Sequence, residues 1–325
     1  SQERMLIVAR RGRENDVISL FKKWDLDAVV IGEVTADGMM RIRDGDRLVV
    51  DMPARPLVED APVYDRSQRR PAYLEDVQLL DISAVAEPPD YTAALKALLG
   101  SLSIASKRWV YSQYDHTVRA NTVVGPGSDA AVIRLKGGTK AVGLTSDGNG
   151  RYCYLDPYMG AMAAVAEGAR NLVCAGMRPV GLTDCLNFGN PEGPEVMWQF
   201  AQVVEGLSAA CKELGIPIVS GNVSFYNETR GSAIYPTPIV GVVGLCEDSS
   251  KVQTQWFKEE GDSIALIGET FEEIGGSEYL QVIGGIVRGR PPMVDLGRER
   301  AVHEVCWEAI QGGLLRSAHD CSDGG

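Results

Sequence analysis

The stretch Val219–Thr229, VSGNVSFYNET, follows the apolar run Ile216–Val219 and places small hydrogen-bonding residues where we expect a strand to end. It contains two N-glycosylation sequons, Asn222-Val-Ser224 and Asn227-Glu-Thr229, which are typical of a surface loop in a secreted protein. It also fits a ligand site, because α/β proteins bind ligands beyond the carboxyl ends of their strands. The rest of the sequence decides between these two interpretations.

The composition argues against the secreted interpretation. Seven scattered cysteines without a Cys-x-x-Cys pair form neither a disulfide framework nor a zinc motif, which favours a reducing cytoplasm. No apolar run approaches the roughly 20 residues of a transmembrane helix, so we expect no membrane partner. The net charge of −12 argues against a nucleic-acid partner. Any phosphate must then be bound by backbone amides, a few placed cations or metal ions.

The pattern of strands and helices predicts a mixed α/β (α+β) fold of about two domains. Residues 1–52 suggest β-α-β-β, with strands at 5–10 and 28–34, a helix near 13–24 and a hairpin turning at Asp44-Gly45. Beyond residue 104, strands alternate with helices rich in small residues. The expected strands there are 117–124, 130–135, 140–146, 180–184, 216–220, 239–245 and 263–268.

Two helices carry clear boundary signals. The first has Asp156 as its N-cap and Pro157 at its first position, and it should stop by Gly176. The second should begin at Pro194, carry one apolar face and end at Gly215. Helices and strands of this kind predict an α/β domain of about 140 residues.

Four polar clusters follow expected strands and could carry chemistry. Two present a carboxylate beside glycines, at Asp129 and Asp147, the third runs from Thr183 through Asp184 and Asn187 to Asn190, and the fourth is Ser220–Ser224. Oxygen ligands without a set of histidines and cysteines suit Mg²⁺ bridging to phosphate. Any one cluster could equally be an ordinary turn, and neither a Walker loop nor Gly-x-Gly-x-x-Gly is present.

The three histidines leave alternatives open. His116 follows Asp115, which could orient its ring for chemistry or hold it in a structural hydrogen bond. His303 falls on an expected helix and is interpreted as a surface residue. His319 precedes Asp320 and could be either a cap or part of a site.

Five strings together resemble the second half of phosphoribosylformylglycinamidine synthases, in their synthetase subunit. These strings are Tyr154-Leu-Asp-Pro157, Asp184-Cys-Leu-Asn-Phe-Gly-Asn-Pro-Glu192, Ser220-Gly-Asn-Val-Ser-Phe-Tyr-Asn-Glu228, Tyr235-Pro-Thr-Pro-Ile-Val-Gly241 and Gly275-Gly-Ser-Glu-Tyr-Leu280. The resemblance implies tandem A and B domains of the aminoimidazole ribonucleotide synthetase-like superfamily. Its A domain forms part of a β-barrel interface, and its B domain is a sheet packed with helices.

On this resemblance the chain divides into four segments and looks cut from something larger. Residues 1–57 would be the end of a first B domain, 58–103 a linker, 104–247 the second, ATP-binding A domain and 248–325 the truncated start of a second B domain. The implied reaction is that of an ATP-dependent carbon–nitrogen ligase of purine biosynthesis. It converts formylglycinamide ribonucleotide and ammonia to formylglycinamidine ribonucleotide. The implied partners are a glutaminase subunit, a small accessory subunit and the N-terminal half of the same chain.

The resemblance also assigns roles to individual residues, with Mg²⁺ and ATP as cofactors. Asp184 and Gly221 match ATP contacts, Asn222 a magnesium ligand, and Ser1, Gln2 and Ser224 substrate contacts. Asp129 and Asp147 resemble the superfamily's acidic magnesium positions, which are thought auxiliary in this A domain. No catalytic residue is assigned within these 325 residues, so we expect the chain alone to be inactive. The alternative is a pseudo-symmetric structural half that holds an auxiliary nucleotide and scaffolds the active half.

Overall fold

The computed structural model describes residues 4–322, which divide into two units, 4–65 and 66–322. The first unit contains helix α1 (Glu14–Lys22) and an antiparallel hairpin of β1 (Met39–Asp44) and β2 (Arg47–Pro53). The hairpin turns at Gly45, whose φ of +55° suits glycine. The predicted helix and hairpin are therefore confirmed.

The strands expected at 5–10 and 28–34 are not formed in this unit. Their apolar side chains are largely exposed, for example 85% for Met5 and 78% for Ile31. A strand needs a neighbour to satisfy its backbone groups, and among the described residues of this unit only β1 and β2 pair. The apolar pattern alone was therefore misleading there.

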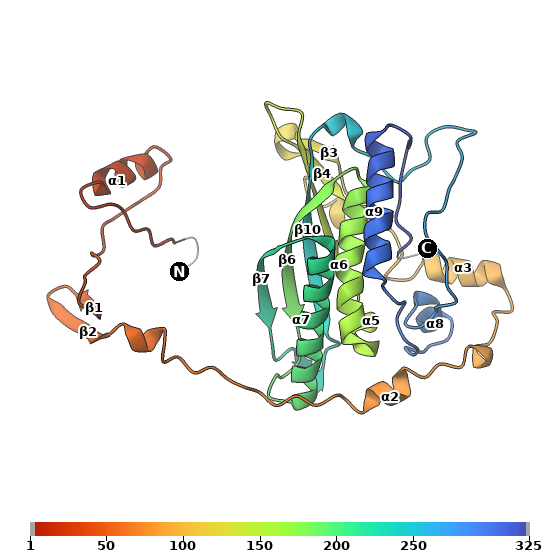
Figure 1. The fold of residues 1–325 in the computed structure, drawn as a ribbon, viewed down its shortest axis with the longest axis horizontal. Coiled ribbons are helices and arrows are strands. Elements are labelled where there is room, and N and C mark those ends of the chain that lie inside the picture. Colours follow the sequence, from red (N-terminus) through yellow and green to blue (C-terminus); the bar gives the residue numbers. More distant parts are fainter. Residues whose placement is uncertain (1–3, 323–325) are drawn as a thin grey trace. The chain divides into compact units, whose positions relative to one another are not determined.

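The second unit is built on a six-stranded sheet of order β3-β4-β5-β10-β6-β7 (Figure 1). All neighbours are antiparallel except β6 and β7, which run parallel and are joined by a helical crossover. The strands are β3 (Thr122–Val124), β4 (Ala131–Arg134), β5 (Ala141–Asp147), β6 (Arg178–Asn187), β7 (Ile218–Ser224) and β10 (Thr237–Cys246). A small hairpin, β8 (Glu228–Thr229) and β9 (Ser232–Ala233), follows β7.

Three further expectations about strands need correction. Residues 263–268 form no strand, and residues 118–120 form a 3₁₀ turn before the short β3. The strand β7 extends through Ser224, so Gly221, Asn222 and Ser224 lie within it and not in a loop beyond its end. Their backbone groups are held by the parallel ladder with β6, which is why the small residues do not end the strand.

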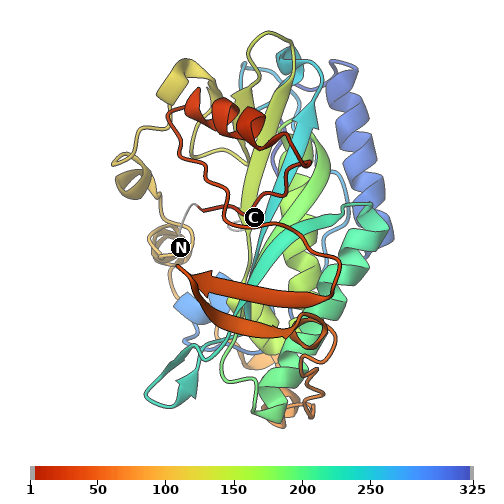
Figure 2. The same ribbon diagram turned by 90° about the vertical axis from the view of Figure 1, so that its left-hand side faces the viewer.

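Three long helices lie side by side on one face of the sheet: α6 (Pro157–Cys174), α7 (Pro194–Leu214) and α9 (Leu296–Gln311) (Figure 1). Figure 2 shows the same layering, with α7 and α9 to one side of the twisted sheet. The shorter helices are α2 (Tyr73–Val77), α3 (Tyr91–Leu99), α4 (Arg108–Tyr111), α5 (Gly150–Leu155) and α8 (Glu278–Val282). No described helix is long and apolar enough to cross a membrane.

The predicted boundary signals position α6 and α7 correctly. The Asp156 carboxylate accepts a hydrogen bond from the Met159 N–H at 3.0 Å, and Gly215 closes α7 with a φ of +69°. The two helices approach closely at Gly206, where a Cβ would lie 2.3 Å from the Tyr158 carbonyl oxygen. Small residues on α6 and α7 therefore set the spacing of the helix layer.

The register of the ladders fixes which face each strand residue occupies. Val240 and Val242 of β10 are fully buried beneath the helices, and they pair with Asp147 and Thr145 of β5. Because side chains alternate along a strand, Asp147 faces the helices, whereas Leu144 faces the opposite side and is 41% exposed. This alternation sorts the candidate residues into two groups.

Candidate functional site

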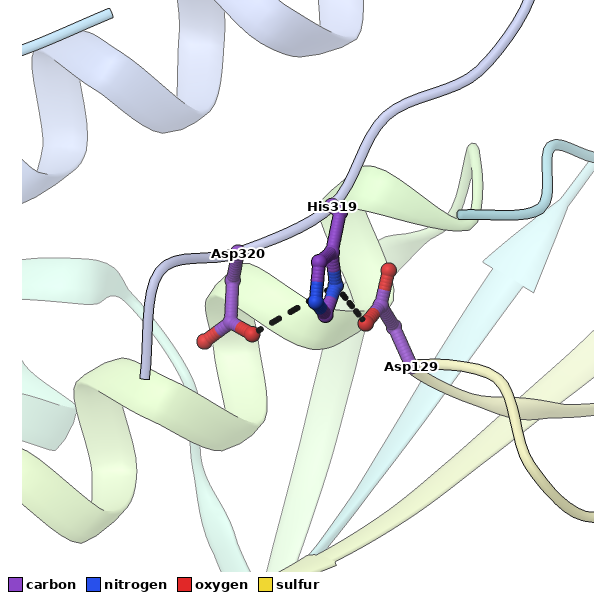
Figure 3. A group of neighbouring side chains, drawn as sticks. All are labelled: Asp129, His319 and Asp320. Carbon is purple, nitrogen blue, oxygen red and sulfur yellow. Dashed lines mark hydrogen bonds and ion pairs between the residues drawn. The ribbon is translucent and has the colours of Figure 1, made fainter. Parts of the chain in front are cut away.

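Asp129, His319 and Asp320 come together beside α6, although Asp129 and His319 lie 190 residues apart in the sequence (Figure 3). Asp129 lies in the loop between β3 and β4. Its Oδ1 is 2.6 Å from His319 Nδ1, and Asp320 Oδ1 is 4.0 Å from the same nitrogen. One ligand atom from each residue lies within 4.8 Å of the others. We call these three residues the acidic cluster. The sequence left His319 open as a cap or a site residue, and the structure places it in contact with Asp129 in this cluster.

Burial perturbs the Asp129 carboxyl. Desolvation raises its pKa to about 6, with the neighbouring Asp320 acting in the same direction and His319 opposing it. The Asp129 side chain is only 4% exposed, whereas the His319 ring is half exposed. The carboxylate is therefore held in a poorly solvated position, next to a ring that is half open to solvent.

Asp147, at the end of β5, is the second buried carboxyl on the helix side. Asn171 of α6 donates a hydrogen bond from Nδ2 to Asp147 Oδ1 at 2.8 Å. Asp147 Oδ2 is buried and has no hydrogen-bond partner among the described residues. Desolvation raises the Asp147 pKa to about 6, and the charge of Asp320 adds to this shift. An unpartnered buried carboxylate oxygen is costly, which marks a place for a cation.

Arg170 precedes Asn171 on α6 and connects the cluster to α9. Its guanidinium donates to Glu299 Oε1 at 2.7 Å and to Asp320 Oδ2 at 3.4 Å. Burial opposes the charged form of Arg170, but the two carboxylates outweigh it and raise its pKa. Two consecutive residues of one helix thus orient two carboxylates, Asp320 through Arg170 and Asp147 through Asn171.

The expectation that His303 is a surface residue is wrong. His303 is 8% exposed, and its Nε2 lies 3.3 Å from Glu299 Oε2, one turn earlier on α9. Burial raises the Glu299 pKa, but contacts with His303 and Arg170 outweigh burial and lower it. The apolar neighbours on the chain gave no sign that this face of α9 packs against α6.

Asp184 and Gly221 are neighbours across the parallel β6–β7 ladder. A Cβ at Gly221 would lie 2.4 Å from Asp184 Oδ1, so the glycine makes room for the carboxylate. Asp184 has no hydrogen bond or ion pair among the described residues, and partial burial raises its pKa. The structure therefore brings together the two residues that were assigned to ATP.

Asn222 and Ser224 face the opposite side of the sheet from Asp184 and Gly221. They pair with Cys185 and Asn187, which alternate with Asp184 along β6. The predicted metal residues thus do not form one site. Asn222 is separated from Asp147 by the sheet and by three strand spacings of about 4.8 Å each. Ser1 and Gln2 lie outside the described residues.

His116 is not part of the acidic cluster. Its ring packs against Gly125, where an added Cβ would lie 3.1 Å from Cδ2 of the imidazole. Asp115 instead accepts hydrogen bonds from the backbone and side chain of Thr117, at 2.8 and 2.9 Å. The suggestion that Asp115 orients the His116 ring for chemistry finds no supporting contact among the described residues.

Comparison with family models identifies the class of protein. The N-terminal domain of AIR synthase related proteins matches residues 127–246, and the C-terminal domain of the same proteins matches residues 1–45 and 259–325. The chain therefore belongs to the AIR synthase related family. The two ends of the chain thus match the same domain model.

Within this family the chain is similar to phosphoribosylformylglycinamidine synthase subunit PurL. It is 55% identical to that subunit from Moorella thermoacetica and 53% identical to that from Caldanaerobacter subterraneus subsp. tengcongensis. Both matches cover 100% of this chain and 44% of the relative. Among solved structures, T. maritima PurL complexed with ATP matches with a TM-score of 0.58 and 28% identity, over 76% of this chain and 38% of that one. The chain thus spans less than half the length of these relatives.

Proposed function

We propose that this chain supplies part of the composite site of an ATP-dependent carbon–nitrogen ligase in purine biosynthesis. The proposed reaction joins ammonia derived from glutamine to formylglycinamide ribonucleotide, and it yields formylglycinamidine ribonucleotide, ADP and phosphate. The observation that carries this proposal is the 55% identity to a PurL subunit over all 325 residues. A glutaminase subunit, a small accessory subunit and an N-terminal half are the proposed partners, and PurLQS from Thermotoga maritima is a structural neighbour.

The β6–β7 pair is the proposed ATP contact. The Asp184 carboxylate accepts hydrogen bonds but repels phosphate, so it suits a ribose hydroxyl or an adenine amino group. Gly221 lets the nucleotide approach the strand beside this carboxylate. On the other face, Asn222 offers an amide oxygen for Mg²⁺ and Ser224 a hydroxyl for the ribonucleotide. Positioning of charged phosphates is the main requirement of phosphoryl transfer.

The acidic cluster fits a second cation. The oxygens of Asp129 and Asp320 would hold Mg²⁺, which neutralises phosphate charge when bound, and the charge of the nearby Asp147, whose Oδ2 is unpartnered, would add to the attraction. His319 already contacts Asp129, so the imidazole must share or release that oxygen. The sequence predicted a magnesium site formed by oxygen ligands alone, whereas the proposed site also includes a histidine. The cluster favours a second candidate function, an auxiliary nucleotide site that holds Mg²⁺ and phosphate without turnover.

Alanine substitution of Asp184 and of Asn222 separates the ligase role from a scaffolding role. The variants are made in a complete synthetase subunit that carries this chain and are assayed with ATP, ammonium and formylglycinamide ribonucleotide. Loss of turnover with unchanged thermal unfolding is expected from the ligase role. Normal specific activity with a lowered melting temperature would instead support a structural half.

The 325-residue chain provides a separate test. We expect it to fold and to form no amidine product with the same substrates. Steady formation of formylglycinamidine ribonucleotide by this chain alone would contradict the proposal that its site is only part of a composite one.

A further inference from the structure

A pocket of about 310 Å³ lies at the end of the helix layer away from the acidic cluster. It is lined by Arg70, Leu74, Gln78, Asp156, Pro157, Tyr158, Trp198, Gln202 and Arg290. The lining comes from α2 and its flanks, the beginnings of α6 and α7, and the segment before α9 (Figure 1). Its volume lies at the lower end of the range for small-molecule sites, which is roughly 300–1,000 Å³.

The walls of this pocket are fixed by contacts behind them. Gln78 donates from Nε2 to the Leu155 carbonyl at 2.7 Å, and Tyr73 donates from its hydroxyl to the Tyr154 carbonyl at 3.0 Å. Gln199 of α7 donates to the same tyrosine hydroxyl at 2.8 Å. The pocket is therefore held in shape by hydrogen bonds between segments far apart in the sequence.

Two arginines at the pocket have no close carboxylate partner among the described residues. The Arg290 side chain makes no hydrogen bond or ion pair with any described residue. Arg70 reaches Gln78 Oε1 only at 3.5 Å and Glu75 Oε1 only at 3.8 Å. By contrast, the adjacent Arg69 is paired with Glu195 at 3.2 Å. A guanidinium without a close carboxylate offers several N–H donors to an anion.

The remaining lining combines polar side chains, Gln78, Gln202 and Asp156, with apolar and aromatic ones. Leu74 is 1% exposed and Pro157 is buried, so they form an apolar floor, and Trp198 adds a partly exposed indole. The only lining carboxylate, Asp156, already accepts the Met159 N–H as the cap of α6. The two arginines must therefore provide most of the attraction for a negative charge, and the floor and the indole suit a flat ring.

We propose that this pocket binds a small phosphate monoester that carries a flat aromatic ring. Arg70 and Arg290 bind the phosphate, and Trp198 with Leu74 contacts the ring. This site is distinct from the residues proposed above for ATP, Mg²⁺ and the ligase substrate. None of Asp129, Asp147, Asp184, Asn222 or Ser224 lines it.

Titration calorimetry with phenyl phosphate tests the proposal, with inorganic phosphate and phenol as matched probes. We expect saturable binding of phenyl phosphate, at least about tenfold tighter than binding of either fragment, since charge and ring act together. Arg70→Met and Arg290→Met should each weaken binding about tenfold, as for the loss of a charge-assisted contact. Arg69→Met, beside the pocket, should change it little.

A second readout keeps the test independent of folding. Phenyl phosphate should change tryptophan fluorescence in the wild type, and Trp198→Phe should remove that change while the melting temperature stays the same. No saturable binding, unchanged affinity in the Arg70→Met and Arg290→Met double variant, or equal affinity for inorganic phosphate would each overturn the proposal. Mg²⁺ binding, measured on the same double variant, should be unaffected.

Discussion

His319 Nδ1 lies 2.6 Å from Asp129 Oδ1, and this contact joins the segment after α9 to the loop between β3 and β4. The imidazole is half exposed while the carboxylate is almost fully buried. The contact therefore joins a solvent-exposed ring to a carboxylate whose pKa burial has raised to about 6. Asp147 is a second carboxyl whose pKa burial raises, so protonation of these two groups should affect stability, which leads to the first prediction.

Asp147→Asn should stabilise the metal-free protein at pH 8. The Asp147 pKa is about 6 in the folded state and ordinarily 3.8, so the folded state binds the proton more tightly and wild-type stability falls as pH rises between these values. Two pKa units correspond to roughly 3 kcal/mol. The variant should exceed the wild type by about 1–3 kcal/mol at pH 8 and match it near pH 4, as measured by urea unfolding.

Mg²⁺ provides the control for this prediction. At pH 8 the cation should raise the melting temperature of the wild type and have little effect on Asp147→Asn, because the variant lacks the charged Oδ2. An unchanged stability difference between pH 4 and pH 8 would contradict the assignment of the shifted pKa to Asp147.

Arg170→Met should destabilise the protein by about 3 kcal/mol, because it leaves Asp320 and Glu299 without their cation in a poorly solvated position. The matched control is Arg300→Met, whose pair with Glu213 is exposed and worth about 0–1 kcal/mol. Denaturant unfolding at pH 7 measures both. Equal effects of the two substitutions would show that Arg170 does not hold the cluster together.

Gly221→Ala should move the Asp184 carboxylate, because the new Cβ would lie 2.4 Å from its Oδ1. We expect a stability cost of about 1–2 kcal/mol and weaker ATP binding. In an Asp184→Ala background the same change should cost little, so a double-mutant cycle isolates the contact. Gly181→Ala on β6 is the control, since its nearest neighbour, Val219 Cγ1, is 3.6 Å away. Additive effects of the Gly221 and Asp184 changes would refute the prediction.

Gly206→Ala should cost about 2–3 kcal/mol, because its Cβ would lie 2.3 Å from the Tyr158 backbone oxygen and would push α7 away from α6. Backbone atoms cannot rotate aside as a side chain can. Thermal unfolding measures the loss, and Gly193→Ala, with its nearest atom at 3.3 Å, provides a milder comparison at the start of the same helix. An unchanged melting temperature would show that the helix pair can separate without cost.

Local signals predicted the helices well and the strands of the first unit poorly. Helix boundary signals act on backbone groups within a few residues along the chain. The sequence alone therefore indicates where α6 begins, at Asp156 and Pro157, and where α7 begins and ends, at Pro194 and Gly215. A strand depends on a partner that local sequence does not name, which is why 28–34 looked like a strand and is not one.

The candidate site was predicted in part. Asp129, Asp147 and Asp184 stood out because each lies at the end of an expected strand or in the turn after it. Arg170 and Asn171 were missed as site residues and the His319-Asp320 pair was left open, because their roles depend on packing of α6 against the sheet and against the segment after α9. Asp184 and Asn222 lie on opposite faces of the sheet because of the register between β6 and β7. The sequence does not predict this register, since it does not show that β7 continues through Ser224.

The 190 residues between Asp129 and His319 also order events during synthesis. A ribosome makes the β3–β4 loop and β5 long before it makes the segment after α9. Until that segment docks, Asp129 lacks its contact with His319, and Arg170 lacks its contact with Asp320. The proposed cation site at this cluster is therefore complete only after the segment that follows α9 has docked.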